Sequence, residues 1–138
     1  MSDSLLLDTC AAIWIATEAS IAEEAIEALD QASDRGDTVH LSPMTAWEIG
    51  MLAARGRLAS PLDPRAFFRQ LASVPNMSVA DLSPEVLIQS SFLPGNPPKD
   101  PVDRIIIATA READMIVVTR DRLILDYAKA GHVQALGC

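Results

Sequence analysis

The sequence predicts a single three-layer α/β/α domain with a central, mainly parallel sheet. Short apolar segments alternate along the chain with longer segments of helical pattern, which is typical of a parallel sheet with helices on both faces. The segments Leu5–Leu7 and Ile116–Val118 are apolar at every position, as expected of strands that are covered on both sides. A length of 138 residues suits one hydrophobic core. We therefore expect residues 1–138 to form one domain.

Helix starts are marked by a serine or an aspartate directly before a proline. These pairs are Ser42–Pro43, Asp63–Pro64, Ser83–Pro84 and Asp100–Pro101. The short polar side chain caps the helix, and proline suits the first helical position because its missing N–H would have no partner there. The predicted helices cover 10–17, 20–35, 43–55, 64–73, a short segment from 84, 101–113 and 122–130. The predicted strands cover 4–7, 38–41, 77–82, 115–119 and 133–136.

Composition excludes several classes of protein. Nineteen acidic and 11 basic residues give a net charge of −8, so we do not expect a broad basic surface for nucleic acid. No apolar run approaches the roughly 20 residues of a membrane-spanning helix, and the first residues lack the basic segment of a secretory signal. Cys10 and Cys138 have no CxxC spacing, which fits two free thiols in a reducing compartment. We therefore expect a cytoplasmic protein that does not bind membranes.

Four acidic residues occupy positions that packing alone would not favour. Glu48 falls within the apolar stripe of its predicted helix. Asp8 and Asp121 follow two predicted strands, and ligand sites of parallel sheets form at the carboxyl ends of the strands. Asp103 lies in the first turn of a very apolar helix, which should pack against the sheet near that edge. Simpler interpretations stay open, namely an exposed stripe edge for Glu48 and helix capping for the aspartates, and for Asp100 we favour capping.

If these four carboxylates share one site, a cation has to compensate their charge. Two carboxylates about 4 Å apart repel each other by roughly 4 kcal/mol at an effective dielectric constant near 20. Oxygen ligands without a nearby histidine or thiolate pattern favour Mg²⁺ or Mn²⁺, and such ions most often serve phosphoryl or phosphodiester transfer. Thr9 and Thr119 stand beside the acids, and we expect them to support the site by ordering bound water.

A family resemblance extends over nearly the whole chain. It is carried by four segments in order, Leu5–Thr9, Ser42–Ile49, Asp100–Ala110 and Val117–Asp121. They resemble the PIN-domain ribonucleases, in particular the VapC toxins of type II toxin–antitoxin modules. The resemblance implies a PIN-like fold with an acidic pocket that holds Mg²⁺ or Mn²⁺ and cleaves RNA. The catalytic and metal-binding residues that it implies are Asp8, Glu48, Asp103 and Asp121, with Asp100 in support. Cys10 stands where other members often carry His, Asn or Ser, and we interpret it as a packed residue rather than a nucleophile.

The same resemblance implies a reaction and two kinds of protein partner. The reaction is hydrolysis of RNA, with tRNA or rRNA as substrate, by a water that the metal activates. The partners are a cognate VapB-like antitoxin and a second copy of the chain in a homodimer. Candidate phosphate contacts are the basic residues near the acidic motifs, Arg104, Arg120, Arg122 and Lys99, although for each residue taken singly we favour a solvated surface charge. We interpret Trp14 and Trp47 as core or interface residues, since aromatic residues are too few for a base-stacking surface.

Two other functions stay open at this point. A receiver-type phosphoacceptor domain shares the size, the parallel sheet, the acidic pocket and Mg²⁺. It normally has paired acids after the first strand and a lysine after the last, whereas Asp8 stands alone and neither Lys99 nor Lys129 follows a strand in that way. The second alternative is a non-catalytic PIN-like protein that binds RNA or a partner, and the complete set of acids argues against it.

Overall fold

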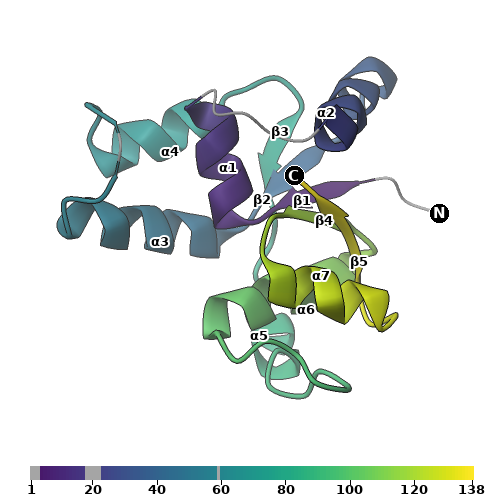
Figure 1. Cartoon of the computed structure of the whole chain (residues 1–138). Coiled ribbons are helices and arrows are strands. Elements are labelled where there is room, and N and C mark those ends of the chain that lie inside the picture. Colours follow the sequence, from purple (N-terminus) through teal and green to yellow (C-terminus); the bar gives the residue numbers. More distant parts are fainter. Residues whose placement is uncertain (1–3, 18–22, 59) are drawn as a thin grey trace.

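The computed structural model describes residues 4–17, 23–58 and 60–138. Within these ranges five strands alternate with seven helices (Figure 1). The strands are β1 (Leu5–Leu7), β2 (Val39–Leu41), β3 (Met77–Val79), β4 (Ile116–Thr119) and β5 (Gln134–Gly137). The helices are α1 (Thr9–Ala16), α2 (Glu23–Arg35), α3 (Pro43–Ala54), α4 (Pro64–Ala72), α5 (Pro84–Gln89), α6 (Pro101–Ala113) and α7 (Arg122–Lys129). In the described part of the chain, no helix combines the length and the apolar character that a membrane span requires.

The predicted elements are present, most of their ends agree to within one residue, and two ends differ by more. The helix predicted for 20–35 is described from Glu23 onward, and residues 20–22 lie outside the described ranges. The strand predicted for 77–82 is too long, because β3 ends at Val79. β3 is an edge strand, and the chain leaves it toward Ser83, whose hydroxyl caps α5.

All five strands are parallel, in the order β3-β2-β1-β4-β5. The chain therefore adds β2 and β3 on one side of β1, and then crosses over to add β4 and β5 on the other side. In open parallel sheets, ligand sites form at such a switch point, outside the carboxyl ends of the two strands that flank it. Receiver domains have the flavodoxin-like order 2-1-3-4-5, so this strand order contradicts the receiver-type alternative.

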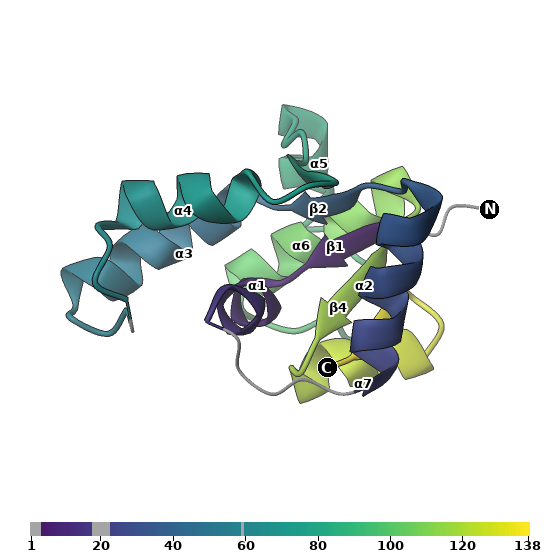
Figure 2. The same ribbon diagram turned by 90° about the horizontal axis from the view of Figure 1, so that it is seen from above.

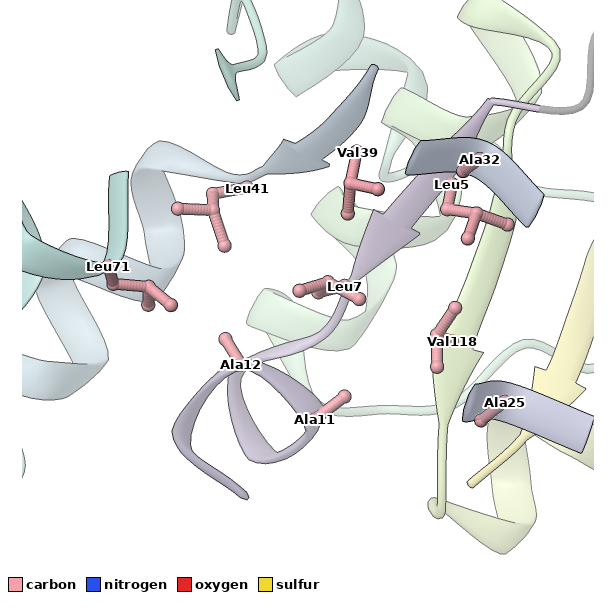
Figure 3. Close-up of a cluster of buried hydrophobic side chains, with 10 residues drawn as sticks. All are labelled: Leu5, Leu7, Ala11, Ala12, Ala25, Ala32, Val39, Leu41, Leu71 and Val118. Atoms are coloured by element: carbon pink, nitrogen blue, oxygen red, sulfur yellow. The ribbon is translucent and has the colours of Figure 1, made fainter. Parts of the chain in front are cut away.

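The sheet is covered by helices on both faces, which confirms the three-layer fold (Figures 1 and 2). Leu5 and Leu7 of β1 point to one face, where they pack with buried alanines of α1 and α2 and with Leu71 of α4 (Figure 3). Leu6 points to the opposite face, where it packs against apolar side chains of α6 and α7. Helices α3 and α4 lie side by side and extend away from the sheet (Figure 2).

Six of the helices begin with an aspartate or a serine whose side chain accepts a hydrogen bond from a backbone N–H of the first turn. The four predicted pairs with proline are all among them. Asp8 links β1 to α1, and Asp121 is the cap of α7, which follows β4. These two helices therefore begin at the same edge of the sheet, on either side of the switch point.

Candidate active site

Asp8 is held in place on both of its carboxylate oxygens. Oδ1 accepts a 2.8 Å hydrogen bond from the backbone N–H of Ala11, and Oδ2 accepts a hydrogen bond from the hydroxyl of Thr119 at the end of β4. The Thr119 hydroxyl in turn accepts a 2.9 Å hydrogen bond from the backbone N–H of Asp121. Because Asp8 is only 5% exposed and Thr119 is fully buried, this network joins the ends of β1 and β4 rigidly.

Glu48 of α3 is turned toward the same edge of the sheet. Its Oε1 accepts a hydrogen bond from the hydroxyl of Thr9, the residue that follows Asp8. The Thr9 hydroxyl also lies 3.1 Å from the hydroxyl of Thr45, which is fully buried. Thr9 therefore anchors the Glu48 carboxylate by a direct side-chain contact, and its expected role in ordering bound water stays a prediction.

The remaining acids come from the first turns of α6 and α7. Asp121 caps α7 through the N–H groups of Leu123 and Ile124, and Asp100 caps α6 as predicted. Asp103 lies in the first turn of α6. The structure brings together four acids, two neighbours on α1 and an Arg–Trp pair around one hollow of about 260 Å³, lined by Asp8, Thr9, Cys10, Trp14, Glu48, Asp103, Arg120 and Asp121. A larger hollow of about 1030 Å³ flanks β5, and it has a mainly apolar lining.

Three acids of the hollow, Asp8, Glu48 and Asp103, resist ionisation. Burial, and after it the charges of Asp100, Asp121, Asp8 and Glu48, together raise the pKa of Asp103 to about 7. Burial also raises the pKa of Asp8 and of Glu48, against the opposing effect of the threonine hydroxyls. The exposed Asp100 acts on the site from outside the hollow, since its charge contributes to the raised pKa of Asp103 and of Glu48. The cluster thus holds more negative charge than its surroundings stabilise.

Cys10 differs from the prediction that it packs in the interior, because its side chain is exposed. Partial burial raises the pKa of its thiol to about 11, and the charges of all four acids of the hollow act in the same direction. A thiol with this pKa is protonated at neutral pH and is a poor nucleophile. The expectation that Cys10 is not a nucleophile agrees with this environment.

The donor set of the hollow fits a hard divalent cation. Its acids offer carboxylate oxygens, the ligands that Mg²⁺ and Mn²⁺ prefer, and a bound cation would offset the repulsion between their negative charges. Over residues 4–17, 23–58 and 60–138, no three His, Cys, Asp or Glu side chains converge in the arrangement of a metal cluster. Two of the carboxylates, those of Asp8 and Glu48, are turned toward threonine hydroxyls instead.

The basic residues near the acidic motifs take different positions. Arg120 lines the hollow. Arg104 points to the proline-rich loop, where its Nε donates a 2.7 Å hydrogen bond to the backbone oxygen of Pro98. Lys99 lines a separate hollow next to that loop, and Arg122 is exposed at the first position of α7. Of these four candidate phosphate contacts, only Arg120 is among the described residues that line the acidic hollow.

The two tryptophans also differ from each other. Trp47 is 54% exposed on α3, so its assignment to the core is wrong and the interface alternative stays open. Trp14 is partly buried and lines the acidic hollow, a position that the sequence analysis did not foresee. The available signal was the spacing within α1, whose first turn begins after its cap, Asp8. Trp14 lies four residues after Cys10, so the two side chains share one face of this helix.

Comparison with known proteins agrees with this geometry. The family model described as PIN domain matches residues 5–130. The chain belongs to the PIN domain family. It is 29% identical over 119 residues to Ribonuclease VapC22 of Mycobacterium tuberculosis, an alignment that covers 86% of this chain and 88% of the relative. This PIN domain protein is thus related to the VapC ribonuclease toxins of VapBC toxin–antitoxin systems.

Solved structures share the fold of this PIN domain protein. A structure of VapBC2 from Rickettsia felis, bound to a DNA fragment from its promoter, contains a chain that aligns with a TM-score of 0.67 and 11% identity, covering 97% of this chain and 98% of the other. DNA-bound VapBC from Salmonella typhimurium aligns with a TM-score of 0.66 and 17% identity, over 99% and 98% of the two chains. FitAcB from Neisseria gonorrhoeae aligns with a TM-score of 0.58 and 20% identity, over 96% of each chain.

Proposed function

We propose that this PIN domain protein is a metal-dependent endoribonuclease toxin that hydrolyses phosphodiester bonds in tRNA or rRNA. The observation that carries the proposal is that Asp8, Glu48, Asp103 and Asp121 all line one hollow at the switch point of the sheet. The relationship to a protein named as a ribonuclease supports it. The site lies where open α/β sheets bind ligands, and its acids have the chemistry that divalent-metal nucleases require.

Each of the four acids has a role that its surroundings support. Asp8, Glu48, Asp103 and Asp121 would hold Mg²⁺ or Mn²⁺, which when bound lowers the pKa of a water molecule and neutralises charge on the phosphate. Asp8 is preorganised by Thr119, and Glu48 by Thr9. Asp103, whose pKa is about 7, would release its proton when a cation is bound at neutral pH.

The proposal includes protein partners and a location in the cell. Neighbours in the solved structures are VapBC and FitAcB assemblies, and this supports a cognate VapB-like antitoxin that inhibits the protein. We also propose a homodimer in the cytoplasm, without association with membranes. We also propose that Arg104, Arg122 and Lys99 contact RNA, because these residues stand next to the acidic motifs in the sequence.

An RNA cleavage assay tests the proposal. The purified chain, free of antitoxin, is incubated with tRNA or structured rRNA in Mg²⁺ or Mn²⁺, and we expect cleavage that EDTA abolishes. Asp8→Asn and Glu48→Gln should abolish it as well. Asp63→Asn is the matched control, because Asp63 caps α4 in the same way as Asp8 caps α1 but is fully exposed and does not line the hollow. Binding of RNA without cleavage would support the non-catalytic alternative instead.

A further inference from the structure

The rim of the acidic hollow carries one aromatic and one basic side chain, Trp14 of α1 and Arg120 after β4. The guanidinium carbon of Arg120 lies 3.8 Å from the centre of the Trp14 ring. The Nε of the same guanidinium donates a 2.8 Å hydrogen bond to the backbone oxygen of Cys138. The aromatic ring and the hydrogen bond together fix the position of the guanidinium.

The backbone places this pair with respect to the acids. Arg120 stands between Thr119, whose hydroxyl donates to Asp8, and Asp121, which lines the hollow. Trp14 belongs to the short helix that Asp8 caps. The positively charged group is therefore tied to the same two elements, α1 and the end of β4, that position the carboxylates.

We propose that Trp14 is a positioning residue, which holds the Arg120 guanidinium at the rim so that it binds an RNA backbone phosphate next to the bond that is cut. This inference rests on the ribonuclease function proposed above. Of the described residues that line the hollow, Arg120 is the only basic one, so it is the cation best placed to meet a phosphate beside the acids. A guanidinium binds phosphate through paired hydrogen bonds, and one that is already held in place loses less freedom on binding.

Base stacking on Trp14 is a weaker explanation of the same pair. At 3.8 Å the guanidinium is in van der Waals contact with one face of the indole ring, so a base cannot occupy that face at the same time. A cation–π contact at a partly exposed site shifts an equilibrium about two- to fivefold. This range sets the size of the effect expected when the ring is removed.

The first experiment separates positioning from catalysis by steady-state kinetics of RNA cleavage. Trp14→Leu should raise KM about two- to fivefold and leave kcat within about twofold of the wild-type value. Trp14→Phe should restore most of the wild-type KM, because a smaller aromatic ring still holds the guanidinium. Trp47→Leu is the matched control, since Trp47 is exposed on α3 and does not line the hollow. An unchanged KM in Trp14→Leu, or a fall in kcat with no change in KM, would overturn the inference.

Salt dependence identifies the ligand of Arg120. For single-stranded nucleic acid, each phosphate contact contributes about 0.7 to the slope of log affinity against log salt. We expect Arg120→Ala to reduce the slope of log(1/KM) by about this amount, and Arg120→Lys and Trp14→Leu to keep the wild-type slope because they keep the positive charge. Arg69→Ala, an exposed position on α4, is the control. A wild-type slope in Arg120→Ala excludes the phosphate contact.

Fluorescence keeps this test independent of the proposed activity. Trp47→Phe leaves Trp14 as the single tryptophan of the chain, and its emission is followed while a short oligoribonucleotide is added in Mg²⁺ and read within seconds. We expect a saturable change that Arg120→Ala abolishes. If the wild-type chain cuts no RNA, the ribonuclease proposal fails, and a saturable change would still support phosphate binding by Arg120. The absence of any change overturns the inference, whether or not the chain cuts RNA.

Discussion

Removing the charge of Asp103 is expected to stabilise the metal-free protein. Folding raises the pKa of this carboxyl from 3.8 to about 7, so the folded state binds the proton more tightly than the unfolded state does. The stability that the protonated group contributes is present below pH 4 and is lost as the pH rises toward 7. Asparagine imitates the protonated form at every pH. Asp103→Asn should therefore gain little at pH 4 and most at pH 8.

The size of this gain follows from the same pKa change. A full shift from 3.8 to about 7 corresponds to about 4 kcal/mol. The side chain is only partly buried, and screening by solvent reduces this value, so we expect about 2 kcal/mol at pH 8. Most of the effect comes from burial and from the neighbouring charges of the hollow, and both are removed when the chain unfolds.

Urea denaturation in EDTA, at pH 4 and pH 8, measures the gain as a difference in the free energy of unfolding. Asp63→Asn is the control, because hydrogen bonds from the first turn of α4 lower the pKa of the exposed Asp63, and neutralising it should give no gain. A variant Asp103→Asn that is no more stable than the wild type at pH 8 would refute the reasoning. So would a gain of equal size at both pH values.

Three further outcomes are expected. Saturating Mg²⁺ should stabilise the wild-type chain by about 2.7 kcal/mol at a concentration of 100 times Kd, and thermal melts of Asp8→Asn should show much less of this effect. The apparent affinity for Mg²⁺ should rise between pH 6 and pH 8 as Asp103 loses its proton, and calorimetry that finds the same Kd at both pH values would contradict this. Thr119→Val should lower the free energy of unfolding by about 1–3 kcal/mol, measured by urea denaturation, because it removes the buried hydroxyl that donates to Asp8. Thr17→Val should lower it little, because the hydroxyl that it removes is exposed and donates to a helix carbonyl.

Local signals in the sequence were sufficient to predict the elements, and the four acids that they singled out line one hollow. The Ser–Pro and Asp–Pro pairs mark helix starts because capping depends only on neighbouring residues, and all four pairs begin helices. The uninterrupted apolar strand Leu5–Leu7 indicates a sheet covered on both faces, as the structure has it. The strand order could not be predicted, because it depends on which distant segments of the chain pair with each other and not on any single segment.

The directions of side chains could not be predicted in the same way. Arg104 and Arg120 both stand beside an acidic motif in the sequence. The structure turns Arg104 to the carbonyl of Pro98 in the loop just before its own helix, and Arg120 to the ring of Trp14 in a helix distant in the chain. Glu48 likewise reaches the site through Thr9, a contact across 39 positions. Tertiary packing, which local patterns do not record, decides these roles.

The central claim is that the four acids of the hollow form one metal-dependent ribonuclease site. Its most direct test is RNA cleavage by the antitoxin-free protein, measured in EDTA, after addition of Mg²⁺, and with Asp121→Asn in the same Mg²⁺. We expect no cleavage in EDTA, cleavage in Mg²⁺, and loss of that cleavage in the variant. Cleavage that persists in EDTA, or that is undiminished in Asp121→Asn, would contradict the claim.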